Sequence, residues 1–243
     1  MNSLEKPKVA ILCGGKGTRL REETDTKPKP MVRIGEMPIL WHIMKIYAHF
    51  GFKDFILCLG YKGEIVKQFF ESELLDEEDW NVVFADTGLE AQTGARIKKI
   101  EQYIGEDKFF ATYGDAVADV NIKRLLDFHN KQATKATLTA VHPHSKWGLV
   151  KSGKNGLIGE FVEKPYLYDY VNGGFFIFKK DMFDYLHDSD DCVLETSAFG
   201  RLVDEKQFSM YKHEGFWHSM DNYKDYLDLN KIWNSGNIPW KSW

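Results

Sequence analysis

The stretch Lys8-Val-Ala-Ile-Leu-Cys-Gly-Gly-Lys-Gly-Thr-Arg-Leu20 decides the fold of this chain. Its first part, residues 8–13, is a short apolar run of the kind that forms a strand buried on both faces in a parallel sheet. Glycines follow at once, and they let the backbone approach a ligand with its N–H groups exposed, while Arg19 adds a planar cation suited to phosphate oxygens. We therefore expect an α/β protein with an anion-binding loop at a strand end.

Strand-like and helix-like segments alternate over about the first 145 residues. Apolar residues recur at helical spacing over 38–50, 64–75 and 121–131, and short apolar runs stand at 55–59, 81–85, 109–113 and 136–142. This alternation predicts a Rossmann-like, mostly parallel mixed sheet flanked by helices. Ligands of such sheets bind beyond the carboxyl ends of the strands, which places the glycine loop, Asp86 and Asp115 on one rim.

The character of the sequence changes after residue 145, where short strands and turns replace the alternation. The triplet Lys154-Asn-Gly156 between two strand-like runs predicts a hairpin. We expect a single domain over 1–243, with a nucleotide-binding half at 1–145. Residues 146–243 would form a small β-rich acceptor-binding or lid portion packed on that half, plus an aromatic tail. Trp240 and Trp243 in the tail either form a partner surface or fold back on the core.

Composition excludes several classes of protein. The chain has 243 residues, 43% of them hydrophobic, and a net charge of −4, which suits one globular domain. It has no basic block, so we expect no nucleic-acid partner. It has no apolar stretch of signal or membrane length, so we expect a cytoplasmic protein without a membrane partner. The three cysteines are widely spaced and show no metal-binding pattern, so we expect them to be structural.

Two further motifs point to phosphate chemistry. In Thr24-Asp-Thr-Lys-Pro-Lys-Pro30 the prolines flank Lys29 and should hold it extended, which aims its ammonium at the charge of a transferring phosphoryl group. Gly114-Asp115 ends an apolar strand, and this places one carboxylate, a ligand that magnesium prefers, on the rim of the sheet. The glycine spacing fits neither a P-loop nor a dinucleotide fingerprint. From the residues alone, Asp221 could be the N-cap of the helix that begins after it, and Glu163 and Lys164 could form a surface ion pair.

These motifs carry a resemblance to a known family. Gly14-Gly-Lys-Gly-Thr-Arg-Leu20, Pro28-Lys-Pro30 and Ile34-Gly-Glu-Met-Pro38 resemble the sugar-phosphate nucleotidyltransferases. Within that family, further segments resemble the glucose-1-phosphate cytidylyltransferases over nearly the whole chain. These segments are Lys27–Met31, Pro38–Met44, Gly60–Gly63, Asp86–Gly88, Tyr113–Asp115, Asn172–Phe176 and Gly215–Trp217.

The resemblance implies roles for individual residues. Arg19, Lys29 and Asp115 would be catalytic, and Asp115 and Asp221 would hold Mg²⁺. The nucleotide would be bound by Leu12, Gly14, Gly15, Gly17, Thr18, Arg19, Lys29, Thr93, Gly94 and Asp115. The acceptor would be bound by Glu163, Lys164, Asn172 and Gly173.

The resemblance also implies an activity and its partners. CTP and a small phosphorylated acceptor, glucose-1-phosphate in the first place, would give the CDP-linked acceptor and pyrophosphate for surface polysaccharide precursors, in a homo-oligomer. The acidic segment Asp76-Glu-Glu-Asp79 stands where the glucose enzymes carry a longer basic insertion, and three tyrosines at 166, 168 and 170 precede Asn172. A non-sugar acceptor such as L-glutamine phosphate, used in capsule modification, is therefore an alternative reading, and a non-catalytic nucleotide-binding paralogue is a third.

Overall fold

A computed structural model describes residues 6–74 and 78–243 of the chain. Three expectations fall partly outside these residues. They concern the N-terminal five residues, the end of the helix expected over 64–75, and residues 76 and 77 of the acidic segment.

The centre of the molecule is a seven-stranded sheet in the order β12-β8-β11-β6-β1-β4-β5. Its strands, in chain order, are β1 (Val9–Leu12), β4 (Asp54–Leu59), β5 (Asn81–Asp86), β6 (Lys108–Tyr113), β8 (Ala136–Val141), β11 (Val171–Lys179) and β12 (Phe208–His213). Strand β11 runs antiparallel to both of its neighbours, and every other neighbouring pair is parallel. The expectation of a mostly parallel mixed sheet is confirmed.

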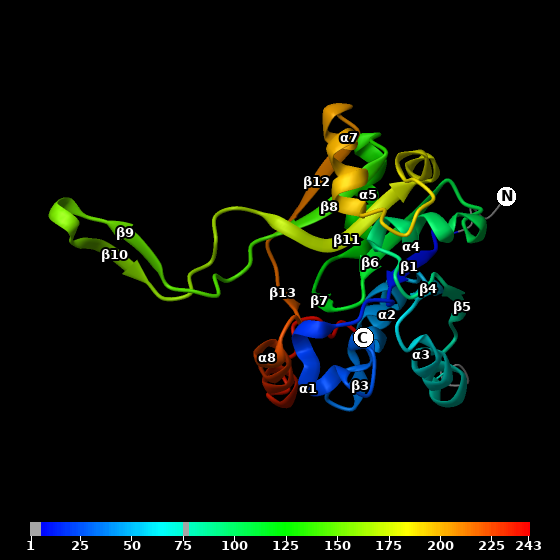
Figure 1. Cartoon of the computed structure of the whole chain (residues 1–243), viewed down its shortest axis with the longest axis horizontal. Coiled ribbons are helices and arrows are strands. Elements are labelled where there is room, and N and C mark those ends of the chain that lie inside the picture. The colour runs from blue at the N-terminus through cyan, green and yellow to red at the C-terminus, as the bar shows by residue number, and fades with distance from the viewer. Residues whose placement is uncertain (1–5, 75–77) are drawn as a thin grey trace.

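Helices cover both faces of this sheet (Figure 1). The α-helices are α1 (Arg21–Thr24), α2 (Ile39–His49), α3 (Gly63–Phe69), α4 (Thr93–Lys99), α5 (Ile122–Gln132), α6 (Leu194–Ser197), α7 (Phe199–Asp204) and α8 (Tyr223–Asn234). Helices α2, α3, α5 and α8 contribute to one buried apolar cluster, and α4, α6 and α7 contribute to a second. Strand residues alternate between the two clusters, with Val9 and Ile11 in the first and Ala10 in the second, because successive side chains of a strand point to opposite faces.

Shorter elements complete the chain. Helical turns stand at Thr18–Leu20, Lys29–Met31, Phe70–Leu74, Glu101–Tyr103, Lys154–Gly156 and Lys180–Tyr185. Strands β2 (Arg33–Ile34) and β3 (Met37–Pro38) form one small antiparallel sheet, and β7 (Ala116–Ala118) and β13 (Trp217–Ser219) form another. The second of these sheets matters for the site, since it joins residues 115 and 221 from opposite halves of the chain.

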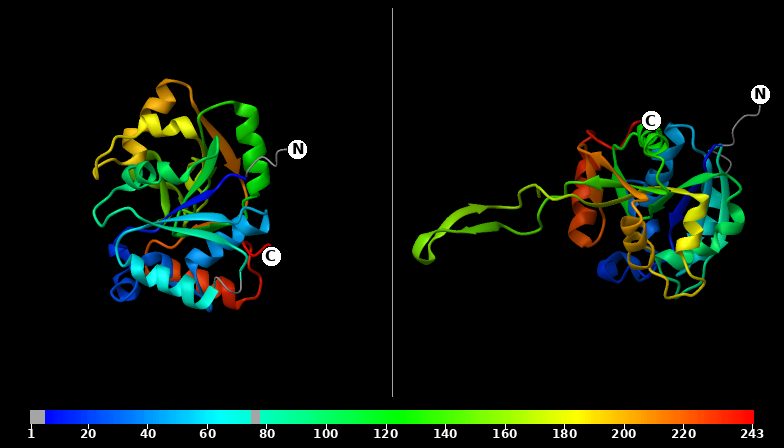
Figure 2. Two further views of the ribbon diagram at one scale, coloured as in Figure 1. Left: turned by 90° about the vertical axis from the view of Figure 1, so that its right-hand side faces the viewer. Right: turned by 90° about the horizontal axis from the view of Figure 1, so that it is seen from above.

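Strands β9 (Leu149–Ser152) and β10 (Ile158–Val162) form a hairpin that projects far from the body (Figures 1 and 2). We call residues 146–164 the arm. The expected turn at Lys154–Gly156 is confirmed, with Asn155 and Gly156 both at positive φ. Not one residue of the arm, all of which is described, is buried. The arm therefore does not pack on the first half of the chain as expected, whereas β11, β12, β13 and α8 return to the body.

The C-terminal tail folds back on the core. The Trp240 side chain is fully buried, its ring lies 5.5 Å from that of Phe216, and its indole N–H points at His42 Nδ1 at 3.4 Å. Trp240 is therefore a core residue and not part of a partner surface, because burial of its large apolar ring inside the chain leaves nothing for a partner to cover. The cysteines behave as expected, since all three are free and buried.

Candidate active site

The loop after β1 is hydrogen-bonded to the end of the neighbouring parallel strand β4. Cys13 N–H donates to the Cys58 carbonyl at 3.0 Å, and the Gly14 carbonyl accepts from Tyr61 N–H at 3.1 Å. Gly17 has a φ of +62°, a left-handed conformation that favours glycine, and its carbonyl accepts from Thr24 Oγ1 at 3.1 Å. The loop is thus held open by bonds to its neighbours, with its backbone turned to the rim of the sheet.

A buried cation lies beneath this loop. The Arg96 guanidinium, from α4, donates to the carbonyls of Gly14, Leu59 and Gly88 at 2.9–3.0 Å and to Thr87 Oγ1 at 2.7 Å. Within the described chain no carboxylate lies at ion-pair distance from it, and burial lowers the pKa of Arg96 below its ordinary value. Carbonyl oxygens and one hydroxyl, and not a carboxylate in contact, hold the Arg96 charge, which raises the potential of the cleft above it. Sequence reasoning missed Arg96, whose only signal is a charge on the apolar side of a short helix.

Lys29 begins a 3-10 turn, Lys29–Met31, and is not extended as the flanking prolines suggested. Pro28 is extended, with φ −71° and ψ 154°, and its carbonyl accepts from Met31 N–H at 2.8 Å, so the chain turns at Lys29. The prolines restrict the backbone of this turn, and the Lys29 side chain is almost wholly buried. A turn therefore fixes the direction of the Lys29 ammonium, and the proline pattern alone did not predict this turn.

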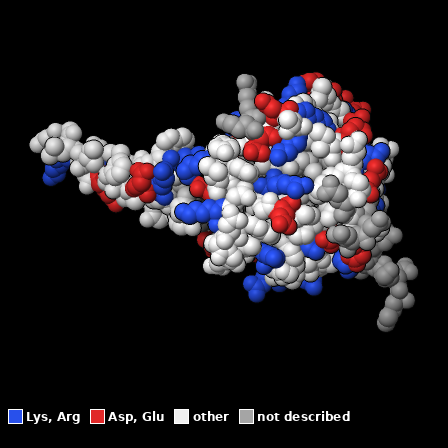
Figure 3. Space-filling view, turned by 90° about the horizontal axis from the view of Figure 1, so that it is seen from below, with Lys and Arg blue, Asp and Glu red and all other residues white. Residues whose placement is uncertain are grey.

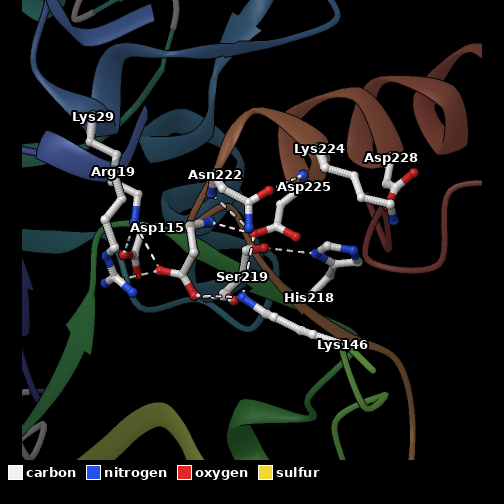
Figure 4. Close-up of polar contacts among 11 residues, drawn as sticks. Arg19, Lys29, Asp115, Lys146, His218, Ser219, Asn222, Lys224, Asp225 and Asp228 are labelled. Carbon is white, nitrogen blue, oxygen red and sulfur yellow. Dashed lines mark hydrogen bonds and ion pairs between the residues drawn. The ribbon is translucent and has the colours of Figure 1, made fainter. Parts of the chain in front are cut away.

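The ammonium of Lys29 joins two carboxylates from opposite halves of the chain. It lies 2.6 Å from Asp115 Oδ2 and 3.2 Å from Asp221 Oδ1, and Arg19 Nη2 lies 3.4 Å from the same Asp221 oxygen. Asp115 precedes β7 and Asp221 follows β13, and the antiparallel pairing of Ala116 with Ser219 brings the two acids together. Figure 4 shows the side chains of Arg19 and Lys29 beside Asp115.

Asp221 does not cap the helix that follows it. Asn222 caps α8, since its side chain accepts from Asp225 N–H at 3.1 Å and the Asp225 carboxylate accepts from Asn222 N–H at 3.1 Å. The Asp221 carboxylate is thereby free to face the cleft, where Ser219 Oγ donates to it at 3.0 Å. Burial alone would raise the pKa of Asp221, but Lys29, Ser219 and Arg19 together outweigh burial and hold that pKa below its ordinary value. Asp221 is therefore held as an anion.

The opposite wall of the cleft is a chain of polar contacts. Thr93 Oγ1 donates to Glu195 at 2.8 Å, Tyr113 Oη donates to the other oxygen of Glu195, and Asn172 Nδ2 donates to Tyr113 Oη at 3.0 Å. Gly94 packs closely against Cys192. A Cβ at position 94 would stand 2.9 Å from the Cys192 carbonyl oxygen. The structure thus connects Asn172, expected at the acceptor, with Thr93, expected at the nucleotide, through two residues that sequence reasoning missed.

The cleft between these walls has a volume of about 300 Å³. It is lined by Leu12, Gly14, Gly15, Gly17, Thr18, Arg19, Lys29, Thr93, Asp115 and Asp221 from the expected set, and also by Cys13, Pro30, Ala91, Gln92, Arg96, Tyr113 and Gly114. Of the residues expected to bind nucleotide, Gly94 alone is absent from this lining. The four residues expected to bind the acceptor are absent from it as well.

Those four residues lie near the root of the arm or behind the cleft wall. Glu163 and Lys164 are exposed and pair with each other at 3.3 Å, as the surface-pair alternative predicted. The Gly173 carbonyl accepts from Trp217 Nε1 at 2.8 Å. At the arm root, however, Lys146 Nζ reaches to 4.0 Å from the carboxylates of both Asp221 and Asp225 (Figure 4). No pattern in the sequence predicted that Lys146 lies near the site, because only the tertiary structure places it beside Asp221 and Asp225.

The carboxylates of Asp115 and Asp221 suit a divalent cation whose other ligands are phosphate oxygens and water. Oxygens of Asp115 and Asp221 lie within 3.2 Å of one ammonium, so the two carboxylates converge on one point. The described residues include no group of three or more His, Cys, Asp or Glu side chains that could hold a metal. Two carboxylates completed by water and phosphate oxygens is an arrangement typical of magnesium. The residues present therefore fit such an ion.

Comparison with known proteins agrees with this fold. The nucleotidyl transferase family matches residues 8–235. A probable glucose-1-phosphate cytidylyltransferase of Bacillus subtilis is 39% identical over 254 residues, with 97% of this chain and 100% of the relative covered. Glucose-1-phosphate cytidylyltransferase of Salmonella typhimurium is 41% identical over 257 residues, covering 97% and 99%. A UDP-glucose pyrophosphorylase in complex with UDP-glucose superposes with a TM-score of 0.74 at 16% identity, covering 96% and 100%, and this likeness concerns the fold alone.

The chain belongs to the nucleotidyl transferase family. It is accordingly an enzyme of the nucleotidyltransferase class, and its resemblance to the cytidylyltransferase branch is confirmed over nearly the whole chain. No helix among the described residues is long and apolar enough to span a membrane.

Proposed function

We propose that this enzyme transfers a cytidylyl group from CTP to glucose-1-phosphate and releases pyrophosphate. The observation that carries the proposal is the placement of Lys29 between Asp115 and Asp221 at the mouth of a glycine-lined cleft. About 40% identity to glucose-1-phosphate cytidylyltransferases over nearly their whole length supports the choice of both substrates.

Different residues would bind the two anionic substrates, CTP and the acceptor phosphate. The backbone of Gly14, Gly15 and Gly17 would receive the triphosphate, with the charge of Arg96 beneath and Arg19 at the side. Gln92 and Thr93 line the same cleft and would contact the nucleoside. The acceptor phosphate would approach from the side of Asn172 and Lys146.

The chemistry needs no nucleophilic side chain. An oxygen of the acceptor phosphate would form a bond to the α-phosphorus of CTP, while the bond from that phosphorus to the oxygen bridging to the β-phosphate breaks and pyrophosphate leaves. Lys29 and Arg19 would hold the two anions in line against their repulsion and stabilise the charge of the transition state. Mg²⁺, held by Asp115 and Asp221, would supply further positive charge to the phosphate oxygens.

Two observations favour a second acceptor, a non-sugar phosphate such as L-glutamine phosphate. The alignments with both cytidylyltransferases extend over more positions than the 243 residues of this chain, so those relatives carry segments that it lacks. In addition, Glu163 and Lys164, the residues expected at a sugar acceptor, do not line the cleft.

A pyrophosphate-release assay with magnesium tests both versions. Four nucleoside triphosphates are crossed with glucose-1-phosphate and a panel of small phosphates that includes L-glutamine phosphate. Pyrophosphate release with CTP and glucose-1-phosphate supports glucose-1-phosphate as the acceptor. Release only with CTP and a non-sugar phosphate shows that the acceptor is the non-sugar phosphate. No release with any pair that contains CTP would overturn cytidylyl transfer. Chelation of the metal should stop release, and added Mg²⁺ should restore it.

A further inference from the structure

Asp221 stands at a junction between a strand and a helix. Strand β13 ends at Ser219, and one further bond, from Met220 N–H to the Asp115 carbonyl at 2.8 Å, continues its pairing with the first half of the chain. Helix α8 begins at Tyr223. Asp221 therefore lies outside both the small β7–β13 sheet and the helix, and neither element by itself fixes the direction of its carboxylate.

The carboxylate of Asp225 supplies this support. Its Oδ2 accepts from Asp221 N–H at 2.9 Å and from Asn222 N–H at 3.1 Å. The bond to Asn222 belongs to the capping box of α8, whereas the bond to Asp221 reaches one residue further, to the residue that faces the cleft. Figure 4 shows Asp225 beside Asn222 at the start of the helix. One carboxylate thus ties the Asp221 backbone to the first turn of a 12-residue helix.

Asp225 is itself held firmly. It is 9% exposed, and its carboxylate is stabilised by the two N–H groups, by the N-terminal end of α8 and by Lys146 Nζ at 4.0 Å. Lys146 belongs to the arm root, and Figure 3 shows Lys and Arg side chains gathered where the arm joins the body. A buried polar group whose partners are all in place is rigid. Asp225 can therefore keep Asp221 in one position.

The position of Asp221 matters because a metal ligand acts through its geometry. Mg²⁺ demands near-ideal octahedral coordination, so a carboxylate that can turn away binds it less well. Residues that hold metal ligands by hydrogen bonds commonly account for about 10- to 100-fold in metal affinity. Ser219 Oγ donates to the Asp221 carboxylate and Asp225 holds the Asp221 backbone, so both ends of this residue are fixed.

We propose that Asp225 is a positioning residue for the metal site, and that it sets the Mg²⁺ dependence of CTP binding by holding the backbone of Asp221. This inference rests on the proposed cytidylyl transfer, because it requires Asp221 to meet a metal ion that CTP also binds. It goes beyond that proposal, since Asp225 lies behind Asp221 and outside the lining of the cleft.

Calorimetric titration with CTP, in Mg²⁺ and in EDTA, tests the inference. Asp225→Ala removes both hydrogen bonds, so it should raise the dissociation constant of Mg²⁺·CTP by at least about tenfold. Without the metal, the same variant should bind CTP as the parent does. Asp225→Asn keeps an oxygen that can accept from both N–H groups, and the charge that it loses pairs with Lys146 only at 4.0 Å, so its affinity for Mg²⁺·CTP should stay within about threefold of the parent.

Asn222→Ala is the matched control. It removes the other half of the capping box, the bond from Asp225 N–H to the Asn222 side chain, but it leaves both N–H groups that the Asp225 carboxylate holds. This variant should lower the free energy of unfolding in urea, as Asp225→Ala should, and leave the affinity for Mg²⁺·CTP unchanged. Circular dichroism checks that all variants are folded.

The measurements separate this role from the reaction itself. Pyrophosphate release by Asp225→Ala should recover at high Mg²⁺ concentration, because the loss lies in metal binding and not in the chemical step. Equal losses of Mg²⁺·CTP affinity in Asp225→Ala and Asn222→Ala, an Asn variant as impaired as the Ala variant, or an Ala variant that binds like the parent would each overturn the positioning role alone. A parent that binds CTP equally well in Mg²⁺ and in EDTA would overturn the metal site, and this role with it.

Discussion

The Lys29 ammonium lies 2.6 Å from Asp115 Oδ2, across 86 residues of sequence, and 3.2 Å from Asp221 Oδ1, across 192. One cation thus holds together two carboxylates that the fold brings from different halves of the chain. The two acids, left without Lys29, would repel each other in a partly buried cleft.

Lys29→Met should lower kcat by about 10²- to 10³-fold, the loss typical of removing one group that stabilises transition-state charge. Lys29→Arg keeps the charge but cannot place a compact ammonium between the acids, so it should restore activity only in part. Pyrophosphate release measures both variants, and circular dichroism confirms folding. A Met variant within a few-fold of the unmodified enzyme would remove Lys29 from the catalytic groups.

Gly14→Ala should destabilise the protein by about 1–3 kcal/mol, because overpacking forces a well-held neighbour to move. The added Cβ would stand 2.0 Å from Arg96 Nη1, and Arg96 is fixed by its hydrogen bonds. Gly15→Ala is the matched control, since a Cβ there meets nothing within 4 Å. Urea unfolding of both variants measures the difference. Equal stability would show that the Arg96 side chain can shift without cost.

Lys146→Met should raise KM for the acceptor by roughly fivefold and leave kcat nearly unchanged, because a partly exposed charge contributes up to about 1 kcal/mol. Lys146 lies 4.0 Å from Asp221 and is 54% exposed. Lys154→Met, at the exposed tip of the same arm, is the control and should change neither constant. A rise in KM for CTP instead would place Lys146 on the nucleotide side.

The stability of the fold should fall as pH falls from 6.5 towards 4, in part through His42. Burial lowers the pKa of His42 from 6.5 to about 4, and it outweighs the hydrogen bond from Nε2–H to the Ile34 carbonyl, which acts in the opposite direction. The unfolded chain therefore binds this proton first, so the contribution is complete above 6.5 and is lost on acidification, up to about 3 kcal/mol.

In the parent protein, the unfolding free energy should fall between pH 6.5 and 4. His42→Gln should make this fall less steep, because the variant lacks one group that binds a proton in the unfolded chain. Burial also lowers the pKa of His129 to about 4, so a slope will remain in the variant. Urea unfolding at a series of pH values gives both slopes. Identical slopes for variant and parent would show that His42 takes up its proton inside the folded state.

Local pattern in the sequence was enough for the parallel part of the sheet and for many of the residues that line the cleft. The run 8–13 became β1, the glycines became the loop, and Asp115 fell on the rim, because each depends on neighbours within a few residues. The Lys154–Gly156 turn was predictable for the same reason. The capping box of Asn222 and Asp225 is equally local. It caps α8 without the Asp221 side chain, which can therefore face the cleft.

The remaining decisions belong to the tertiary structure. The insertion of antiparallel β11 between β6 and β8, the pairing of β7 with β13 that joins Asp115 to Asp221, and the position of Arg96 under Gly14 all connect residues far apart in sequence. The arm is the clearest case, since the Lys154–Gly156 turn predicted a hairpin within a portion packed on the first half of the chain, whereas the arm projects away from the core. Sequence by itself determined which segments could form and which residues could meet phosphate. Long-range packing decided which of them meet, because contact between distant segments depends on the path of the whole chain.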